Sequence, residues 1–276
     1  NGSECEPYLT ADHRIMLEYA DDIVFGLRAM MKAVAAPEGV ILIEDNKPDA
    51  VALMEEKVAP YENIRVVAAK TQYPEGAEKM LIKKVMGRQV PSGKLPADVG
   101  CVVSNTSTAK AISDAIQKGM PLVERAVSVT GDFIRNPGNY MVKLGTNVQE
   151  LIDHCGGITG DDVVLKMGGP MMGAPLKDTN VPIIKGSNGV IAIAADHTEE
   201  KECIKCGRCV DVCPMELQPL EIYKYGQLGD AEKLLTLNVM DCFSCKCCEY
   251  ICSSKIPLVS KINAAKGLVM PLLKKK

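Results

Sequence analysis

The chain has 276 residues, of which 47% are hydrophobic and only 4% aromatic, with no tryptophan. This is enough apolar side chain for one to three packed domains, whose cores must be aliphatic and rich in methionine. A formal net charge of -3 argues against nucleic-acid binding, which calls for a basic face, and no apolar run approaches the roughly 20 residues that span a bilayer.

The first 121 residues show alternating helix and strand patterns. Apolar side chains recur at helical spacing from residue 12 to residue 35, and Pro48 stands at the start of a second helical pattern. β-branched runs lie between the helices. This order predicts an α/β domain built on a mostly parallel sheet. The predicted helices are 12–35, 48–58, 75–86 and 106–118, and the predicted strands are 40–43, 63–69 and 99–103.

Residues 122–195 follow a different pattern. Short strands surround a single helix, and glycines and prolines mark the turns, so this segment is predicted to be a small α+β module. The run Gly168 to Gly173 (GGPMMG) is predicted to be a tight structural turn and not a dinucleotide-binding loop, because Pro170 interrupts it and no helix follows. The predicted strands are 127–129, 140–144 and 163–167, and the predicted helix is 147–155.

The last part of the chain, from residue 196, is predicted to be helical. A charged stretch at 198–202 links it to the preceding module, and Asp230 is expected to cap a short helix. The chain ends in three lysines, for which we expect a solvated tail, with contact to an anionic membrane as the alternative. The predicted helices are 219–225 and 230–237, followed by a longer one that includes Leu258, Val259, Ile262, Leu268 and Val269.

Eight of the 12 cysteines form two copies of one spacing in this last part. Each copy reads C-x-x-C-x-x-C-x-x-x-C, which is the ligand spacing of a [4Fe-4S] cluster. Three thiolates in one tight loop occupy three corners of a cube, and the fourth, at the start of a helix, reaches the neighbouring cube. We therefore predict two [4Fe-4S] clusters that pass electrons one at a time. The predicted ligands are Cys203, Cys206, Cys209, Cys213, Cys242, Cys245, Cys248 and Cys252.

Disulfides and structural zinc are the two alternatives for these cysteines. A disulfide framework is typical of small secreted domains, and no signal peptide is in view. Zinc needs only two C-x-x-C pairs for each ion and would leave half of each copy idle. Cys247 adjoins Cys248, but only Cys248 keeps the spacing, so Cys247 is predicted not to be a ligand. Loss of iron is expected to unfold this region, because ligation and folding are coupled.

Polar side chains gather in two segments of the first half. Asn1, Glu4 and Glu6 precede the first helix, and Asn105 and Thr108 follow the third predicted strand, at the carboxyl end of the sheet. Both positions suit a ligand, since carboxylates and amides bind ribose or ribityl hydroxyls and helix N-termini bind phosphate. Both also suit ordinary turn formation and helix capping. The residues alone leave these alternatives open.

Several segments together resemble one protein family. They are NGSECEPYLT at the start of the chain, YPEGAE from Tyr73, LPADVGC from Leu95, the GGPMMG turn, the doubled cysteine motif and SKIPLV from Ser254. In this order they resemble the C subunit of the Rnf electron transport complex over essentially the whole chain. That family is similar in turn to the flavin-bearing, NADH-binding subunit of respiratory complex I.

The resemblance implies a multidomain chain with three parts. Residues 1–121 are expected to form a truncated FMN- and NADH-binding α/β domain. Residues 122–195 are expected to form a small α+β β-grasp module of the SLBB type, and residues 196–276 a helical, ferredoxin-like domain with two [4Fe-4S] clusters.

The resemblance also implies roles for particular residues. Asn1, Glu4 and Glu6 match the stretch that lines the flavin and nicotinamide pocket, and Asn105 and Thr108 match the polar loop that holds FMN. Crossed ligation, as in two-cluster ferredoxins, is expected for the clusters. One cluster is assigned to Cys203, Cys206, Cys209 and Cys252, and the other to Cys213, Cys242, Cys245 and Cys248.

The sequence departs from this family in two places. The family's glycine-rich loop, which binds FMN phosphate and NADH, lies upstream of the Asn-Gly segment, and the chain begins at Asn1 without it. Because Asn1 is not a methionine, the chain is expected to be processed or a fragment. We therefore expect FMN and NAD(H) in the full-length family member, and weak or absent binding of both to this polypeptide alone. Ser253 stands where proline usually follows the fourth cysteine, which is a minor change because the thiolate is kept.

The function implied by the resemblance is that of an oxidoreductase component in an ion-translocating ferredoxin:NAD oxidoreductase. It would pass electrons between NAD(H), flavin and ferredoxin-linked partners at the cytoplasmic face of the bacterial membrane, bound peripherally to the other Rnf subunits. No catalytic side chain is singled out. Two alternatives stand beside this function: a soluble flavin and iron-sulfur cobalamin reductase of related architecture, and a non-catalytic relay that uses only its two clusters.

Overall fold

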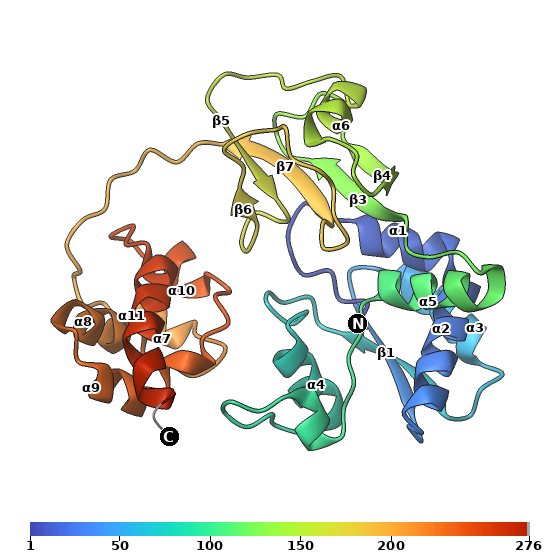
Figure 1. The fold of residues 1–276 in the computed structure, drawn as a ribbon, viewed down its shortest axis with the longest axis horizontal. Helices are drawn as coiled ribbons and strands as arrows, with labels where there is room; N and C mark the ends of the chain where they lie inside the picture. Colours follow the sequence, from blue (N-terminus) through green and yellow to red (C-terminus); the bar gives the residue numbers. More distant parts are fainter. Residues whose placement is uncertain (275–276) are drawn as a thin grey trace. The chain divides into compact units, whose positions relative to one another are not determined.

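The computed structural model describes residues 1–274, which form two compact units (Figure 1). The first unit consists of Asn1–Gln89 and Pro96–Ala195, and the second of the loop Val90–Leu95 with the residues from Asp196 onward. The final two lysines of the predicted tail lie outside the described residues. No helix among residues 1–274 combines the length and the apolar character that crossing a membrane requires.

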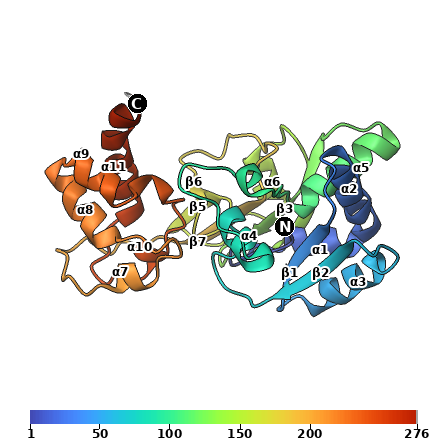
Figure 2. The ribbon, with the colours of Figure 1, turned by 90° about the horizontal axis from the view of Figure 1, so that it is seen from below.

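The α/β part of the first unit is built on two parallel strands, as predicted. Its elements are α1 (Ala11–Glu18), α2 (Ala20–Ala33), β1 (Gly39–Glu44), α3 (Pro48–Val58), β2 (Ile64–Ala69), α4 (Glu78–Met86), a 3-10 turn (Pro96–Val99) and α5 (Thr106–Lys118). Successive side chains of a strand point to opposite faces. Ile41 and Ile43 of β1 pack into a core with α1, α2 and α3, whereas Leu42 packs toward α4 on the other face. The paired strands β1 and β2 are drawn side by side in Figure 2.

Three predicted elements differ from the structure. The predicted helix 12–35 is two helices, because the backbone at Tyr19 leaves the helical region (φ -130°, ψ 34°) before α2 begins. The helix predicted at 75–86 begins three residues later than predicted, at Glu78. The predicted strand 99–103 is wrong, because Gly100 has a φ of +68° and the backbone from 101 to 105 takes no regular form.

Helices α2 and α5 pack so closely that Gly26 leaves no room for a side chain. A Cβ at this position would lie 2.0 Å from the Ala109 carbonyl oxygen of α5. We expect Gly26→Ala to lower the free energy of unfolding by about 3 kcal/mol, because the two helices must separate to admit the methyl group. Gly186→Ala, whose Cβ would meet no atom within 4 Å, should change it by less than about 0.5 kcal/mol. Denaturant unfolding followed by circular dichroism tests this, and equal losses in both variants would contradict it.

The rest of the first unit is a five-stranded sheet with one helix, which confirms the predicted α+β module. Its elements are β3 (Glu124–Thr130), β4 (Gly138–Lys143), α6 (Val148–His154), β5 (Val163–Met167), β6 (Ala174–Pro175) and β7 (Gly189–Ala194). The strand order is β4-β3-β7-β5-β6; β3 and β7 are parallel and the other neighbours antiparallel. Leu151 and Ile152 of α6 pack on Val127 and Val190. The GGPMMG run is the turn between β5 and β6, as predicted.

The described part of the second unit contains helices and no strand. Its elements are α7 (Arg208–Asp211), α8 (Pro219–Leu228), α9 (Ala231–Thr236), a 3-10 turn (Val239–Asp241), α10 (Cys247–Tyr250) and α11 (Leu258–Leu273). The core includes Ile222, Leu234 and Ile262, which are almost entirely buried. Asp230 caps α9 as predicted, since its carboxylate accepts a hydrogen bond of 2.9 Å from the Lys233 amide.

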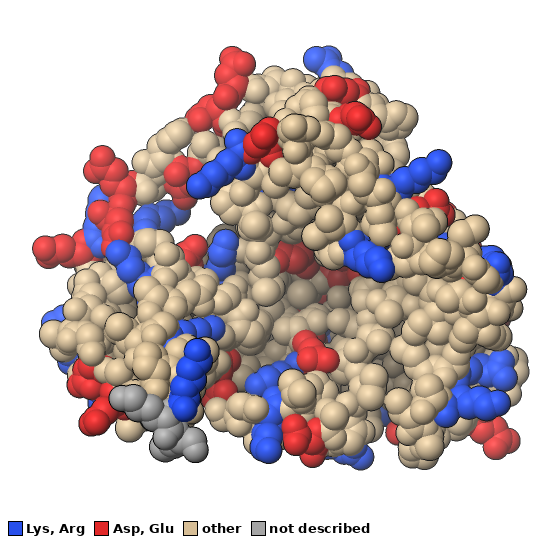
Figure 3. Space-filling view, in the orientation of Figure 1, with Lys and Arg blue, Asp and Glu red and all other residues tan. Residues whose placement is uncertain are grey.

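Basic and acidic side chains are interspersed over the face of the molecule drawn in Figure 3. Together with the net charge of -3, this gives that face no continuous basic surface. Binding to nucleic-acid phosphates depends on such a surface. The prediction from composition that the chain binds no nucleic acid stays a prediction.

Candidate functional site

Four cysteines from both copies of the motif surround one hollow in the second unit, which we call the first cysteine hollow. Cys203 and Cys206 lie in the loop before α7, Cys209 lies in α7, and Cys252 follows α10. The remaining wall is apolar and includes Ile256. Three sulfurs therefore come from the first copy of the motif and one from the second.

A second cysteine hollow has the complementary composition. Cys242, Cys245 and Cys248 come from the second copy of the motif, and Cys213 is the fourth cysteine of the first copy. Cys247 does not line this hollow, although it adjoins Cys248 in α10. The structure thus brings together the two sets of four that the crossed arrangement requires.

The backbone repeats itself along the two copies. Residues with positive φ occur at matching positions after the first cysteine of each copy, namely Lys205 and Gly207 in one and Ser244 and Lys246 in the other. Non-glycine residues rarely adopt this conformation, so the loops are bent against local preference. Such bends turn a short loop back on itself, which brings its three cysteines to one hollow.

The environment of the thiols favours bound cations. Burial raises the pKa of Cys213, and burial followed by the charges of neighbouring cysteines raises the pKa of Cys248 to about 12. Thiolates are the form that binds metal, so holding four of them together needs a compensating positive charge, which the iron of a cluster supplies. Among residues 1–274, no three His, Cys, Asp or Glu side chains converge where one metal ion would sit.

Asn1 and Asn105 meet beside the start of α5. The Asn1 amino group donates to the Ser104 carbonyl oxygen (2.8 Å), and the Asn1 side chain donates to the Gly76 carbonyl oxygen (3.0 Å). Asn105 caps α5 by accepting from the Ser107 amide (2.8 Å), and it donates to a carboxylate oxygen of Asp12 (2.7 Å). The capping alternative is therefore realised at Asn105.

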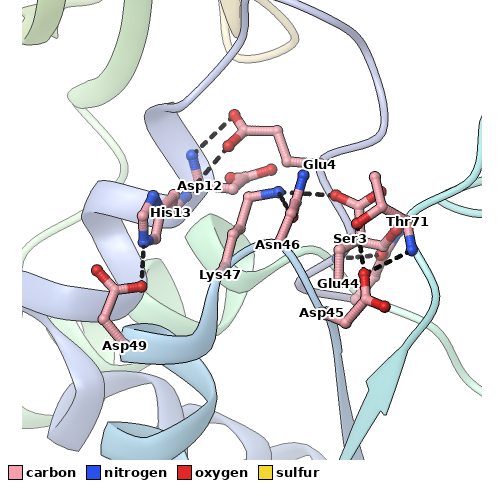
Figure 4. Close-up of polar contacts among 11 residues, drawn as sticks. Ser3, Glu4, Asp12, His13, Glu44, Asp45, Asn46, Lys47, Asp49 and Thr71 are labelled. Carbon is pink, nitrogen blue, oxygen red and sulfur yellow. Dashed lines mark hydrogen bonds and ion pairs between the residues drawn. The ribbon is translucent and has the colours of Figure 1, made fainter.

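Glu4 is nearly buried at the start of α1 (Figure 4). Its two carboxylate oxygens accept hydrogen bonds from the backbone amides of Asp12 (3.0 Å) and His13 (3.2 Å). Burial, followed by the negative charge of Asp12, raises the pKa of Glu4 to about 7. Through Asp12, Glu4 and Asn105 belong to one polar cluster.

Glu6 and Thr108 lie apart from this cluster. The Glu6 carboxylate accepts from the amides of Met171 (2.9 Å) and Met172 (2.7 Å) in the GGPMMG turn, where a Cβ on Gly169 would lie 2.3 Å from a Glu6 oxygen. Thr108 is exposed on α5 and lines a different cavity, at the start of β3. The structure therefore brings three of the five predicted flavin residues together and leaves two elsewhere.

A cavity of about 410 Å³ adjoins Asn1. Asn1 and Ser104 supply polar groups to its wall, and the rest comes from apolar side chains of α2 and α4, among them Met30 and Leu81, and from the segments 34–40 and 97–103. A mainly apolar hollow with a few polar groups is the usual form of a cofactor site. The chemistry of this wall is compatible with a flavin ring.

Three family models match successive parts of the chain. Residues 1–114 match the Nuo51 FMN-binding domain, residues 126–175 the SLBB domain, and residues 202–256 the 4Fe-4S dicluster domain. Their order is the one that the sequence predicts, and they confirm the predicted multidomain fold class.

Curated relatives are similar over nearly the whole chain. The C subunit of the Na(+)-translocating ferredoxin:NAD(+) oxidoreductase complex of Acetobacterium woodii is 42% identical over 96% of the chain and 61% of its own length. Over the part that it spans, the chain is similar to the C subunits of ion-translocating ferredoxin:NAD(+) oxidoreductase complexes. The C subunit of the proton-translocating complex of Clostridium ljungdahlii is 46% identical over 82% of the chain and 50% of its own length. The C subunit of the ion-translocating oxidoreductase complex of Rhodobacter capsulatus is 43% identical over 97% and 52%. The chain spans between half and two thirds of these three relatives.

Solved structures share the fold of this chain at low identity. An NAD+-reducing [NiFe]-hydrogenase in its H2-reduced state matches with a TM-score of 0.62 and 15% identity, over 98% of this chain and 54% of that one. The same kind of enzyme in its air-oxidized state gives a TM-score of 0.56 and 16% identity, over 95% and 45%. At these identities the likeness concerns the fold alone.

Sequence reasoning missed several polar residues beside Glu4. Glu44, at the end of β1, forms a buried ion pair of 2.7 Å with Lys47 (Figure 4). One oxygen of Glu44 and the hydroxyl of Ser3 are buried without a hydrogen-bond partner among residues 1–274. The only signal in the sequence was an acid directly after a predicted strand, which is also where loops ordinarily begin.

The raised pKa of Glu4 predicts a dependence of stability on pH. A folded-state pKa of about 7, against an ordinary value of 4.5, means that the protonated carboxyl stabilises the fold. That contribution is complete below about pH 4.5 and is lost as the pH rises through 7, about 3 kcal/mol in total. Unfolding measured between pH 5 and 8 should show this loss, and Glu4→Gln should reduce it. The exposed Glu55→Gln should leave the wild-type slope unchanged; an unchanged slope in Glu4→Gln would contradict the prediction.

Proposed function

We propose that this chain is the electron-transfer part of the C subunit in an Rnf complex. It passes electrons between NAD(H), flavin and ferredoxin-linked partners through two [4Fe-4S] clusters, and the complex couples this flow to ion translocation. The observation that carries the proposal is the pair of cysteine hollows, each bordered by three cysteines of one copy and one of the other. Crossed ligation of this kind belongs to proteins that hold two clusters within one small domain.

The cysteines hold the clusters as thiolates in this proposal. The tight loops fix three sulfurs of each set, and Cys213 and Cys252 each tie the loop of one copy to the cluster of the other. Each cluster therefore depends on both copies of the motif. Loss of either cluster is expected to weaken the other, because the ligands share one short stretch of chain.

The polar cluster and the adjoining cavity are proposed as the protein's side of a flavin site. Asn1 supplies an amide at the cavity wall, and Glu4 and Asn105 fix the starts of α1 and α5 by accepting hydrogen bonds from backbone amides. A bound flavin supplies the exchange between two-electron hydride chemistry with NAD(H) and one-electron transfer. The Glu6 carboxylate already accepts hydrogen bonds from two amides of the GGPMMG turn. We therefore assign Glu6 to holding that turn and not to contact with flavin.

The partners proposed are the other subunits of the Rnf complex, met at the cytoplasmic face of the membrane. The curated relatives are named as subunits of such complexes, which supports this choice. Co-purification with membrane subunits is the expected result when the chain is expressed in a cell that makes the complex. Association with a corrinoid enzyme instead would support the cobalamin reductase. If a full-length version reduces an artificial acceptor with NADH, the alternative of a non-catalytic relay is rejected.

Anaerobic purification with counts of iron, sulfide and flavin is the central experiment. We expect about eight irons and eight sulfides in each chain, as two [4Fe-4S] clusters contain. Electron paramagnetic resonance of the reduced protein should show two interacting clusters. A colourless protein with stoichiometric zinc would overturn the proposal. One tightly retained FMN would overturn the expectation that this polypeptide alone binds flavin weakly.

Replacement of Cys248 and of Cys247 tests the ligand assignment directly. Cys248→Ser should reduce bound iron by about half or more, because the second hollow loses one of the four sulfurs that line it. Cys247→Ser is the matched control one residue away and should retain the full iron count. Iron and sulfide analysis of both proteins, purified side by side without oxygen, measures this. Greater iron loss in Cys247→Ser would exchange the two assignments.

A further inference from the structure

A second cavity in the first unit lies between α5 and the start of β3, and the proposed functions do not use it. Its volume is about 210 Å³. Met120, Leu122 and Val123 from the segment after α5 form much of its wall, with Met141 of β4 beside them. The cysteines and Asn1 lie outside its wall. The cavity is smaller than the roughly 300 Å³ at which sites for drug-sized ligands begin, so a flavin or a dinucleotide does not fit.

Arg125 gives this cavity its chemical character. Its side chain is half-buried, and its Nε is fully buried without a hydrogen-bond partner among residues 1–274. The acid that acts on it most is Asp12, whose two oxygens already accept hydrogen bonds from Asn105 (2.7 Å) and Ser107 (3.0 Å). An arginine keeps its charge even when buried. Because Asp12 is already engaged by other donors, Arg125 has no anion of its own among the described residues.

The other charged groups in the wall do not supply that anion. Asp114 is occupied by Lys110 (2.7 Å) and Lys118 (2.7 Å). Glu124 lines the cavity and is adjacent in sequence, but neighbouring side chains of a strand point to opposite faces, and it forms no ion pair with Arg125 in the described part of the chain. Lys185, exposed at the wall, adds a second positive charge. Buried charges are ordinarily paired, so the wall is incomplete without an anion.

We propose that this cavity binds a small organic carboxylate with a short aliphatic body. The terminal N–H groups of a guanidinium can donate to the two oxygens of a carboxylate, whereas the sealed Nε of Arg125 is out of a ligand's reach. The methionine and leucine side chains of the wall would take up the aliphatic body, which a free phosphate ion lacks. The ligand therefore needs both a planar anionic group and apolar carbon.

Butyrate is the probe that tests this, with the cluster-loaded protein purified without oxygen. Calorimetric titration should show one butyrate bound in each chain, and 1-butanol and inorganic phosphate should bind at least tenfold more weakly. Arg125→Met should weaken butyrate at least tenfold. Arg65→Met, which removes an exposed arginine paired with Glu38, should leave it unchanged. Equal binding of butyrate and butanol, tighter binding of phosphate, or no binding of butyrate to the wild type would each overturn the proposal.

Thermal unfolding of the same proteins separates a ligand role from a structural one. Without ligand, Arg125→Met should melt no lower than the wild type, because it removes a buried charge that lacks a partner. A lower melting temperature would mean that the arginine supports the fold, and would overturn the ligand role. Ala111→Leu fills the cavity from α5 while keeping Arg125, and it should also weaken butyrate at least tenfold. Unchanged affinity in Ala111→Leu would place the bound probe elsewhere and contradict the proposal.

Discussion

Removing iron from the purified protein is expected to unfold the second unit and to leave the first unit folded. The two cysteine hollows lie against the core of the second unit, because Ile256, Leu258, Val259 and Ile262 belong both to a hollow wall and to that core. When the clusters leave, these side chains lose one of their packing surfaces. The four thiols of each set then face one another without a cation between them.

The ligand cysteines are part of the core of the second unit, which makes this loss large. Cys248 is buried in that core, and the other predicted ligands that pack against it are Cys203, Cys209, Cys213, Cys242 and Cys252. Where the ligands form part of the core, the free energy of metal binding is also free energy of folding. The first unit has two cores, around β1 and around β3 and β7, and neither contains a predicted ligand cysteine.

Amide hydrogen exchange before and after anaerobic iron chelation measures this outcome. Amides of α8 and α11 should lose protection by at least a hundredfold, whereas amides of β1, β3 and β7 should keep theirs. Refolding with iron and sulfide should restore the protection of α8 and α11. Persistent protection of these two helices in iron-free protein would contradict the prediction, and exposure of β3 and β7 would show that the units do not unfold separately.

The elements predicted most accurately are those with strong local signals at both ends. Helix α3 was predicted with its exact bounds, because proline fits only the first turn of a helix. Helix α5 was also predicted with its exact bounds, since Asn105 caps its start and Gly119 ends it with a φ of +63°. In both helices the boundary residue acts through its own backbone or side chain. The rest of the fold is not needed to locate it.

The elements that were missed depend on contacts distant in sequence. Tyr19 interrupts a continuous helical pattern, and the acids Asp21 and Asp22 after it were the only local sign of a new helix. Gly100 adopts a conformation that strands do not use, yet glycine alone does not announce a positive φ. Strand β7 is a continuous apolar run between β3 and β5, and such runs do not reveal whether they form strand or helix.

The candidate sites also differ in whether their signals are local in the sequence. Cysteine spacing is a local signal, so both sets of predicted ligands could be read from the sequence, including the choice of Cys248 over Cys247 that iron counts will test. The polar cluster is not local. Glu4 and Asn105 meet only because α1 and α5 begin side by side, with Asp12 between them. Glu6 was grouped with Glu4 by sequence, but its partner is a turn 165 residues away.

The buried pair of Glu44 and Lys47 is the other feature with a large expected effect. The nitrogen–oxygen distance is 2.7 Å, and the side chains are only 1% and 7% exposed. Lys47 also donates to the Asn46 side chain (3.2 Å), whereas the second oxygen of Glu44 has no hydrogen-bond partner among residues 1–274. Lys47 is therefore the main partner for the negative charge of the Glu44 carboxylate, which is otherwise buried away from water.

Lys47→Met is expected to lower the free energy of unfolding by about 4 kcal/mol at pH 7, because it leaves the charge of Glu44 buried and unpaired. The positive charge of Lys47 also lowers the pKa of Glu4, so its removal makes the ionised form of this second buried carboxyl less stable. Lys57→Met removes a surface ion pair with Asp21 and should cost less than about 1 kcal/mol. The double variant with Glu44→Gln should recover most of the loss, since no buried charge then remains at this pair. Denaturant unfolding of the three variants measures these losses. Similar losses in Lys47→Met and Lys57→Met would mean that water reaches Glu44. A double variant that does not recover stability would mean that Lys47 acts through packing.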